Sequence, residues 1–319
     1  MKVLIISTLN EKSGSCVVID NMMDALRARS VCTNLWAPSG EFLNPDEIIP
    51  GGLISSLFYM LRNKNRLQDF DKIVVYTIRG VFIHLLINRS ILYVHEINSK
   101  ASLKYKLVNM MINLNKSQLF VVNPEIEKKY PCCDVKSIGN IYLNNIDNTS
   151  EFKNGSVLMI GAFTFDKGID LLKELAIKYP NIEFYFLTTL LKQDRVRQLE
   201  FEQYCLNAPE NLFVTTDQTK KRTLLDKSSY LISLSRLDES FGLVIFEAVQ
   251  HNCLPLVFSN TGSRYLLGDY PFLPNDEYLD GFDLLLDKVK AKVDLSKIRR
   301  DFIHRFGENQ IVEKFVSDE

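Results

Sequence analysis

The chain has 319 residues, enough for two domains of ordinary size, each with its own hydrophobic core. Its formal net charge is -1. This near balance argues against nucleic acid as a general partner, because binding a polyanion usually needs a clear excess of Lys and Arg. No uniformly apolar segment approaches the ~20 residues that a membrane-spanning helix needs. The six cysteines are not spaced as metal ligands and are expected to be reduced thiols, so we expect a cytoplasmic protein.

The first half opens with an apolar strand at residues 2–7, too short and too soon interrupted for a signal peptide. A polar loop that contains Gly14 follows, and then a helix over residues 16–29. Strand, glycine loop and helix in this order open a Rossmann-like half. One glycine is a weak signal, and an ordinary turn accounts for it at least equally well.

Two helical stretches of this half are amphipathic and basic. Residues 51–66 end in a basic cluster, which is typical of a docked helix with a solvated C-terminal end, and membrane contact is the alternative. Residues 100–115 combine Lys with Leu and Met side chains, so this helix can lie on an anionic bilayer surface. Further strands are predicted near residues 33–36, 72–76, 90–94 and 120–122.

His95 directly follows the predicted strand at residues 90–94. The carboxyl ends of strands are where open parallel sheets bind their ligands. A lone histidine is nevertheless more often structural than functional, so the position alone leaves both interpretations open.

A domain boundary is predicted within residues 140–154, which are rich in Asn, Asp and Ser as linkers are. We therefore expect domains at residues 1–148 and 149–319. The second domain begins with a strand at residues 156–160, a loop that contains Lys167 and Gly168, and a helix over residues 169–179. Later strands are predicted at residues 182–187 and 211–214, the second followed by a loop that contains Asp217.

The most informative stretch lies between two apolar runs, residues 230–234 and 254–258, which read as buried parallel strands. A loop and one helix are expected to connect them. Asp238 or Ser240 is the predicted helix cap, and residues 241–243 form the predicted first turn. Free amides and the positive end of the helix dipole suit an anion such as a phosphate there, and Gly242 allows close approach.

Two carboxylates flank this predicted anion site. Glu247 follows Leu243 by one helical turn, and its side chain should lean back toward the helix start. A carboxylate can accept two hydrogen bonds from a vicinal diol such as a ribose, so phosphate and sugar hydroxyls together indicate a sugar nucleotide. Glu239 and Glu247 can also be ordinary solvated charges. Glu247, however, lies in an almost wholly apolar helix and should be partly buried, in need of a partner.

The segment from Glu239 to Glu247, with Phe241, Gly242 and Leu243 between them, resembles the donor-binding motif of retaining GT-B glycosyltransferases of family four. The resemblance implies that Glu247 holds the nucleotide ribose and that Glu239 contacts hydroxyls of the donor sugar. It also implies that the amides between them meet the sugar and the diphosphate.

Three other elements resemble parts of the same family. Val94, His95 and Glu96 resemble a strand-end element whose histidine reaches the donor sugar, and the loop with Gly14 resembles a cleft-facing glycine loop. Residues 161–168 resemble a loop in which an Arg and a Lys neutralise the donor diphosphate. Lys167 fits that pattern, but Ala162 stands where the Arg is usual. Candidates for a substitute, by sequence neighbourhood only, are Lys192, Arg195 and Arg197.

The resemblance implies an α/β protein of the GT-B fold, with two Rossmann-like doubly wound domains facing a central cleft. The last helix, residues 295–316 with an interruption near Gly307, would cross back to the N-terminal domain. The donor would be bound mainly by the C-terminal half and the acceptor by the N-terminal half. The implied catalytic residues are His95, Lys167 and Glu239, and the implied donor-binding residues are Gly14, Lys167, Asp217, Glu239, Ser240, Phe241, Gly242, Leu243 and Glu247.

The expected activity is that of a retaining glycosyltransferase that uses a nucleotide-diphosphate sugar and no metal or other cofactor. The expected acceptor is a glycan or lipid-linked molecule in bacterial surface polysaccharide synthesis. We expect a cytoplasmic enzyme that can also contact the anionic inner face of the membrane. Ala162 keeps open the alternative of a GT-B protein that binds a sugar nucleotide without turnover. A second alternative is a sugar-nucleotide epimerase or hydrolase on the same fold.

Overall fold

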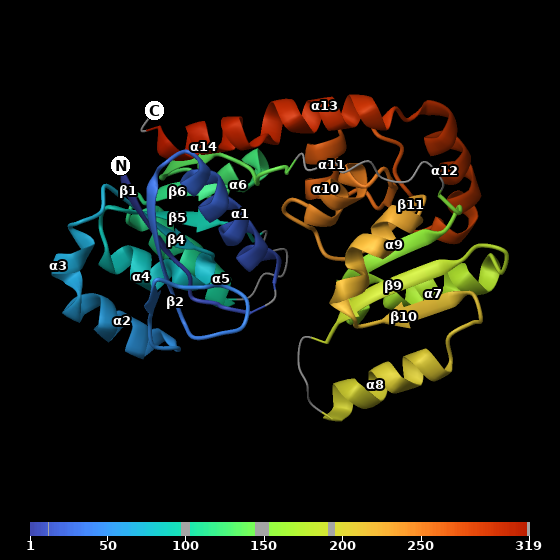
Figure 1. The fold of residues 1–319 in the computed structure, drawn as a ribbon, viewed down its shortest axis with the longest axis horizontal. Helices are drawn as coiled ribbons and strands as arrows, with labels where there is room; N and C mark the ends of the chain where they lie inside the picture. Colours follow the sequence, from blue (N-terminus) through green and yellow to red (C-terminus); the bar gives the residue numbers. More distant parts are fainter. Residues whose placement is uncertain (12, 97–102, 144–152, 191–194, 318–319) are drawn as a thin grey trace. The chain divides into compact units, whose positions relative to one another are not determined.

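The computed structural model describes residues 1–11, 13–96, 103–143, 153–190 and 195–317. The chain forms two compact units, Met1–Tyr142 with His304–Glu319, and Leu143–Ile303. The predicted boundary between residues 148 and 149 lies outside the described residues. Each unit is an α/β layer structure (Figure 1).

The first unit is organised around a parallel sheet of seven strands in the order β3-β2-β1-β4-β5-β6-β7. All predicted strands of this half are present. Two short strands, β3 and β7, were not predicted, because one spans two residues and the other is polar and mostly half-buried. The strands are β1 Lys2–Ile6, β2 Cys32–Ala37, β3 Glu47–Ile48, β4 Lys72–Tyr76, β5 Ser90–Val94, β6 Gln118–Val121 and β7 Asp134–Ser137.

Helices cover both faces of this sheet (Figure 1). The connections β1-α1-β2 and β4-α4-β5 run in opposite directions across the sheet, so right-handed crossovers put α1 and α4 on opposite faces. α14 packs beside α1, whereas α4 lies between α2 and α5. The helices are α1 Gly14–Ala28, α2 Leu53–Arg62, α3 Lys64–Leu67, α4 Val81–Leu86, α5 Leu103–Leu114, α6 Pro124–Glu127 and α14 Glu308–Val316.

The C-terminal segment belongs to the core of the first unit. The predicted interruption near Gly307 is confirmed, because α13 ends at Phe306 and α14 begins at Glu308. Phe315 is fully buried, and the ammonium of Lys72 donates hydrogen bonds to the backbone carbonyls of Phe315 and Val316, both at 3.1 Å. A cation at a helix C-terminus is favoured by the helix dipole, which fixes the end of α14 to β4.

The second unit contains a parallel sheet of five strands in the order β10-β9-β8-β11-β12. The strands are β8 Val157–Ala162, β9 Phe184–Thr189, β10 Leu212–Thr215, β11 Tyr230–Ser233 and β12 Leu254–Val257. The helices are α7 Ile169–Lys178, α8 Arg195–Leu206, α9 Lys221–Lys227, α10 Leu243–Gln250, α11 Thr261–Leu267, α12 Tyr278–Lys292 and α13 Leu295–Phe306. The strand order reverses between β8 and β11, which makes this the switch point where ligands of open α/β sheets bind.

Across the described ranges, none of the helices is both long enough and apolar enough to cross a membrane.

We predict that a methyl group at Gly168 disturbs the second unit far more than one at Gly155. Both glycines have left-handed φ, +78° and +79°, so both alanine variants carry the same conformational penalty of about 1 kcal/mol. An added Cβ at Gly168 would lie 2.4 Å from the Leu234 carbonyl oxygen, whereas at Gly155 it meets nothing within 4 Å. Gly168→Ala should therefore lower the free energy of unfolding by about 2 kcal/mol more than Gly155→Ala.

Urea unfolding followed by far-UV circular dichroism measures this difference. The single tryptophan, Trp36, lies in the first unit, so its fluorescence provides a reference transition that neither substitution should shift. Equal losses for the two alanine variants would contradict the predicted clash.

Candidate functional site

Lys167 and Glu239, two of the predicted donor-site residues, meet at the switch point of the second unit. β8 and β11 are neighbouring parallel strands, so their carboxyl ends lie at the same edge of the sheet. The loop after β8 contains Lys167, and the loop after β11 contains Glu239. Sheet order, rather than proximity in sequence, therefore brings together residues that are 72 positions apart.

Lys167 and Glu239 form an ion pair, with Nζ 2.5 Å from Oε1. Both side chains are partly buried, 32% and 18% exposed. The loop of Lys167 is held close to β11, because Gly168 packs against Leu234 and the backbone amide of Arg236 donates to the carbonyl of Asp166 at 2.8 Å. The structure thus joins two of the predicted catalytic residues directly.

α10 begins without the side-chain cap that the sequence predicts. Its N-cap is Gly242, in a left-handed conformation with φ +88°, and no side chain caps it. The prediction of Asp238 or Ser240 as the cap is wrong, because sequence alone does not reveal that Gly242 turns the chain at this point. Leu243 is the first helical residue, and Phe241 is buried with its ring 5.0 Å from that of Phe246. The first amides of α10 consequently face the same edge of the sheet as Glu239.

Asp238 connects the motif to the next helix instead. Its carboxylate accepts hydrogen bonds from the Thr261 amide at 2.7 Å and from the Thr261 hydroxyl at 2.8 Å, at the start of α11. The Gly262 amide donates to the Glu239 carbonyl at 2.7 Å, and a Cβ on Gly262 would lie 2.7 Å from the Phe241 backbone. The segment from Asp238 to Phe241 is therefore fixed in position by α11.

Glu247 is partly buried, 25% exposed, as its apolar surroundings in the sequence predict. One carboxylate oxygen, Oε1, lies 2.5 Å from the ammonium of Lys221 at the start of α9. The other, Oε2, is buried and accepts no hydrogen bond from the described residues. A buried acceptor without a donor is unfavourable by about 1 to 3 kcal/mol, so this oxygen is suited to a ligand hydroxyl.

Sequence reasoning missed Lys221. It stands in a basic run after β10, and nothing in its spacing distinguishes it from its neighbours Lys220 and Arg222. Asp217, in the loop before it, is exposed and accepts hydrogen bonds from the amide and the hydroxyl of Thr219, at 3.0 and 2.6 Å. These bonds from Thr219 lower the pKa of Asp217. The Asp217 carboxylate thus stabilises its own turn.

Ala162 ends β8, and the structure shows which guanidinium lies near its loop. Arg236, another residue that the sequence analysis missed, forms two bonds of 2.7 Å with the carboxylate of Asp170 and donates to the Phe165 carbonyl at 2.7 Å. Its guanidinium also lies 4.2 Å from the centre of the Phe165 ring. Burial alone would raise the pKa of Asp170, but the bonds from Arg236 lower it. Arg236 therefore positions the loop of Lys167.

The three substitutes suggested by sequence neighbourhood are less well placed or not described. Arg195 and Arg197 lie in α8, where Arg197 is 3.9 Å from Glu200. Arg197 lines a cavity of about 710 Å³ together with Phe163, Thr164 and Phe165 from the loop after β8. Lys192 lies outside the described residues.

Gly14 and His95 belong to the first unit. The prediction that Gly14 belongs to the loop before the helix is wrong. Gly14 is the first residue of α1, whose N-cap is Ser13. His95 follows β5 as predicted, with its ring 4.2 Å from Tyr93 and 5.5 Å from Tyr76. Its Nε2 is buried and has no hydrogen-bond partner among the described residues. Burial lowers the pKa of His95 to about 3, which keeps the imidazole neutral at neutral pH.

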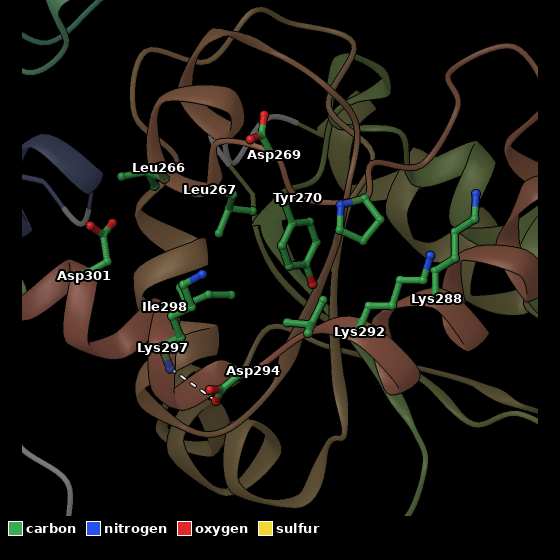
Figure 2. A pocket seen from close by; sticks show the side chains of 12 residues that line it. Leu266, Leu267, Asp269, Tyr270, Lys288, Lys292, Asp294, Lys297, Ile298 and Asp301 are labelled. Carbon is green, nitrogen blue, oxygen red and sulfur yellow. Dashed lines mark hydrogen bonds between the residues drawn. The ribbon is translucent and has the colours of Figure 1, made fainter.

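A separate pocket of about 610 Å³ lies at the far end of α11 (Figure 2). α11 begins at the Glu239 motif and ends at Leu266 and Leu267, which line this pocket, about 10 Å further along the helix. Three lysine and three aspartate side chains line it, and Asp294 accepts a hydrogen bond from the Lys297 amide at 3.2 Å. Neither Lys167 nor the two motif glutamates line it, so it is not the predicted donor site.

No metal centre is formed by the part of the chain that the structure describes, in which no three His, Cys, Asp or Glu side chains are grouped to hold an ion.

Comparison with known proteins agrees with this geometry. The family model of Glycosyl transferases group 1 matches residues 145–296. No curated protein sequence matches the chain. Among solved structures, Anabaena Alr3699/HepE in complex with UDP-glucose has a TM-score of 0.80 at 14% identity and covers 99% of both chains. Sucrose-phosphate synthase from Thermosynechococcus elongatus has a TM-score of 0.75 at 13% identity and covers 99% of this chain and 97% of its own.

A third structure, WaaG, a glycosyltransferase involved in lipopolysaccharide biosynthesis, has a TM-score of 0.70 at 12% identity and covers 99% of this chain and all of its own. At these identities the similarity concerns the fold. The predicted GT-B architecture of two parallel-sheet α/β domains is confirmed.

We predict that His95 does not titrate between about pH 5 and about pH 8, because burial lowers its pKa to about 3. An unfolded histidine titrates near about 6.5, so below that pH the unfolded chain binds a proton that the folded protein does not. His95 therefore makes the protein less stable as the pH falls from about 6.5 toward 3.

The NMR signal of the His95 ring proton, assigned by its loss in His95→Gln, tests this prediction. A titration midpoint near 6.5 would contradict the buried, neutral state. Between about pH 6.5 and pH 3, the free energy of unfolding of His95→Gln should fall less with pH than that of the unmodified protein, because the variant lacks His95.

Proposed function

We propose that this protein is a retaining glycosyltransferase that uses a nucleotide-diphosphate sugar, because the family model of Glycosyl transferases group 1 matches residues 145–296. One observation carries the proposal: the partly buried Glu247 keeps one oxygen, Oε2, without a donor, at the sheet edge where Lys167 and Glu239 meet. A carboxylate with one oxygen held by a lysine and the other unsatisfied is suited to a ribose hydroxyl.

The donor is proposed to bind along the start of α10. Glu247 accepts hydrogen bonds from the ribose, and the amides from Ser240 to Leu243 meet the diphosphate, where the positive end of the helix dipole favours negative charge. Glu239 binds hydroxyls of the sugar, and Lys167 neutralises the phosphates. The HepE structure contains UDP-glucose, which supports a uridine nucleotide as the first donor to try.

Transfer is proposed to proceed with retention by front-side attack. The acceptor hydroxyl oxygen forms a bond to the anomeric carbon on the face from which the diphosphate leaves, as the bond between that carbon and the phosphate oxygen breaks. The acceptor proton passes to an oxygen of the departing diphosphate. Lys167 and the α10 amides stabilise the charge that develops on this leaving group, so the reaction needs no metal ion.

The first unit is proposed to bind the acceptor, a glycan or lipid-linked molecule of a bacterial surface polysaccharide. Neutral His95, with its buried Nε2 unsatisfied, can exchange a hydrogen bond with a sugar hydroxyl. WaaG, similar in fold, is involved in lipopolysaccharide biosynthesis, and this supports a role in surface glycan assembly in the cytoplasm. Ala162 stands where the family usually has Arg, and this favours one alternative, a protein that binds the sugar nucleotide without transferring the sugar.

The proposed division of labour between the two glutamates predicts different losses. Glu247→Ala should weaken UDP and UDP-glucose alike by at least about tenfold, because the ribose is common to both ligands. Glu239→Gln should leave UDP binding nearly unchanged and weaken UDP-glucose more strongly, because it removes a contact with the sugar. Isothermal titration calorimetry on the intact protein measures both, with Glu210→Ala, an exposed carboxylate of the same unit, as the matched control.

Unchanged UDP affinity in a folded Glu247→Ala variant would exclude the ribose role. If no uridine ligand binds the unmodified protein, a panel of other nucleoside diphosphates replaces it in the same design.

The reaction itself is predicted to give a product with the anomeric configuration of the donor sugar, in the presence of EDTA as well as in its absence. One-dimensional proton NMR of the product resolves the anomer through its H1 coupling. An inverted product would contradict front-side attack. Binding without nucleotide release in the presence of lipid-linked acceptors would favour the binding-protein alternative. Donor hydrolysis or epimerisation without any acceptor would favour a sugar-nucleotide hydrolase or epimerase.

A further inference from the structure

α2 presents its apolar side chains to solvent. Of its ten residues only Ser56 and Met60 are buried, whereas Ile54, Phe58 and Leu61 are 71%, 61% and 51% exposed. These three follow the spacing i, i+4, i+7 and so form one row along the helix. The basic C-terminal end is exposed and α2 packs against α4, as a docked helix requires, but the row of Ile54, Phe58 and Leu61 stays exposed.

α5 repeats this arrangement. Val108 and Ile112 are buried, while Leu103, Leu107, Met110 and Leu114 are exposed at the spacing i, i+4, i+7, i+11. The row spans about 16 Å at 1.5 Å per residue. α5 therefore has one apolar face toward its own sheet and a second toward solvent.

The two rows belong to one helical layer. α4 contacts both α2 and α5 (Figure 1). Its Leu86 is also exposed. A cavity of about 420 Å³ lies between α2, α3 and the end of α4. It is lined by the apolar Leu61 and Leu86 and by the basic Lys64 and Arg89, among others. Many exposed apolar side chains on neighbouring helices, rimmed by polar groups, are uncommon on soluble proteins and indicate an interaction site. We refer to the exposed side of α2, α4 and α5 as the apolar face.

The helical layer of the apolar face is mostly basic. The helices α2, α3, α4 and α5 contain no Asp or Glu. Residues 51–124 contain ten Lys and Arg residues and three Asp and Glu residues, although the whole chain has 38 and 39. Exposed basic side chains of the layer include Arg62, Lys64, Arg89 and Lys106. The partner should therefore be negatively charged as well as apolar.

We propose that the apolar face binds reversibly to the surface of an anionic lipid bilayer. Leu, Phe, Ile and Met side chains in rows, flanked by Lys and Arg, are the pattern by which helices lie at the boundary between headgroups and acyl chains. The basic residues are attracted to anionic headgroups, each by about 1 kcal/mol near the surface. A second copy of this chain fits less well, because a two-fold interface would bring the same basic side chains against each other.

This inference stands apart from the proposed function, because the residues of the apolar face are all in the first unit and the donor-site residues Lys167, Glu239 and Glu247 are in the second. It nevertheless suits an enzyme whose acceptor is linked to a lipid, since membrane binding would confine enzyme and acceptor to the same surface.

Vesicle flotation tests the proposal. The intact protein should float with vesicles that contain phosphatidylglycerol and phosphatidylcholine, should not float with phosphatidylcholine alone, and should be released by high salt. The double variants Phe58→Ser with Leu61→Ser, and Leu107→Ser with Met110→Ser, should each lower the fraction bound to anionic vesicles by about tenfold or more. Lys64→Glu with Lys106→Glu should reduce binding in the same way.

Matched controls come from the second unit. Val196→Ser with Leu206→Ser replaces two exposed apolar side chains of α8, which are 66% and 77% exposed, and should leave flotation unchanged. Circular dichroism and UDP titration of every variant separate loss of lipid binding from unfolding and from failure of the donor site.

Two outcomes would overturn the proposal. The first is flotation that is absent, or indifferent to anionic lipid, or reduced equally by the α8 pair. The second is a stable dimer in light scattering that the α2 and α5 variants disperse, which would make the apolar face an interface between copies.

Discussion

Two lysine-glutamate ion pairs set the charge of the proposed donor site. The pair of Lys167 and Glu239 joins the loops that follow the neighbouring strands β8 and β11, and the pair of Lys221 and Glu247 joins α9 to α10. At nitrogen-oxygen distances of 2.5 Å each lysine neutralises one carboxylate. Two partly buried carboxylates can therefore lie at one sheet edge without the desolvation penalty of unpaired charges.

This lack of net charge limits how the diphosphate of the proposed donor could bind. The four side chains together carry no net charge, Ala162 supplies none, and Arg236 already pairs with Asp170. Attraction for phosphate then depends on the amides at the start of α10 and on a change of partners. If sugar hydroxyls donate to Glu239, the ammonium of Lys167 can turn from that carboxylate to a phosphate oxygen. Sugar and diphosphate would then assist each other's binding. The sugar takes the place of Lys167 beside Glu239, which leaves the ammonium to the diphosphate, and the diphosphate holds Lys167 away from Glu239, which leaves the carboxylate to the sugar.

The sequence predicts the motif connection and every strand except β3 and β7, because buried parallel strands are continuous apolar runs whatever surrounds them. It fails where a result depends on tertiary contacts. Gly242 as the cap of α10 requires a backbone angle that no neighbouring residue reveals. Lys221 and Arg236 find their carboxylate partners through the order of strands, 26 and 66 residues away. The exposed rows of α2 and α5 show the same limit, since helical periodicity identifies an apolar face but not what covers it.

Whole-chain charge gives a similarly incomplete account of partners. The net charge of -1 is the sum of a basic region, residues 51–124, and an acidic remainder. Salt screens exposed charges beyond about 8 Å under physiological conditions, so acidic residues elsewhere on the molecule do little to cancel the potential near α2 and α5. What a surface attracts depends on the charges within that distance. The balance that argues against a general affinity for polyanions is therefore compatible with one basic, apolar face that recognises an anionic surface locally.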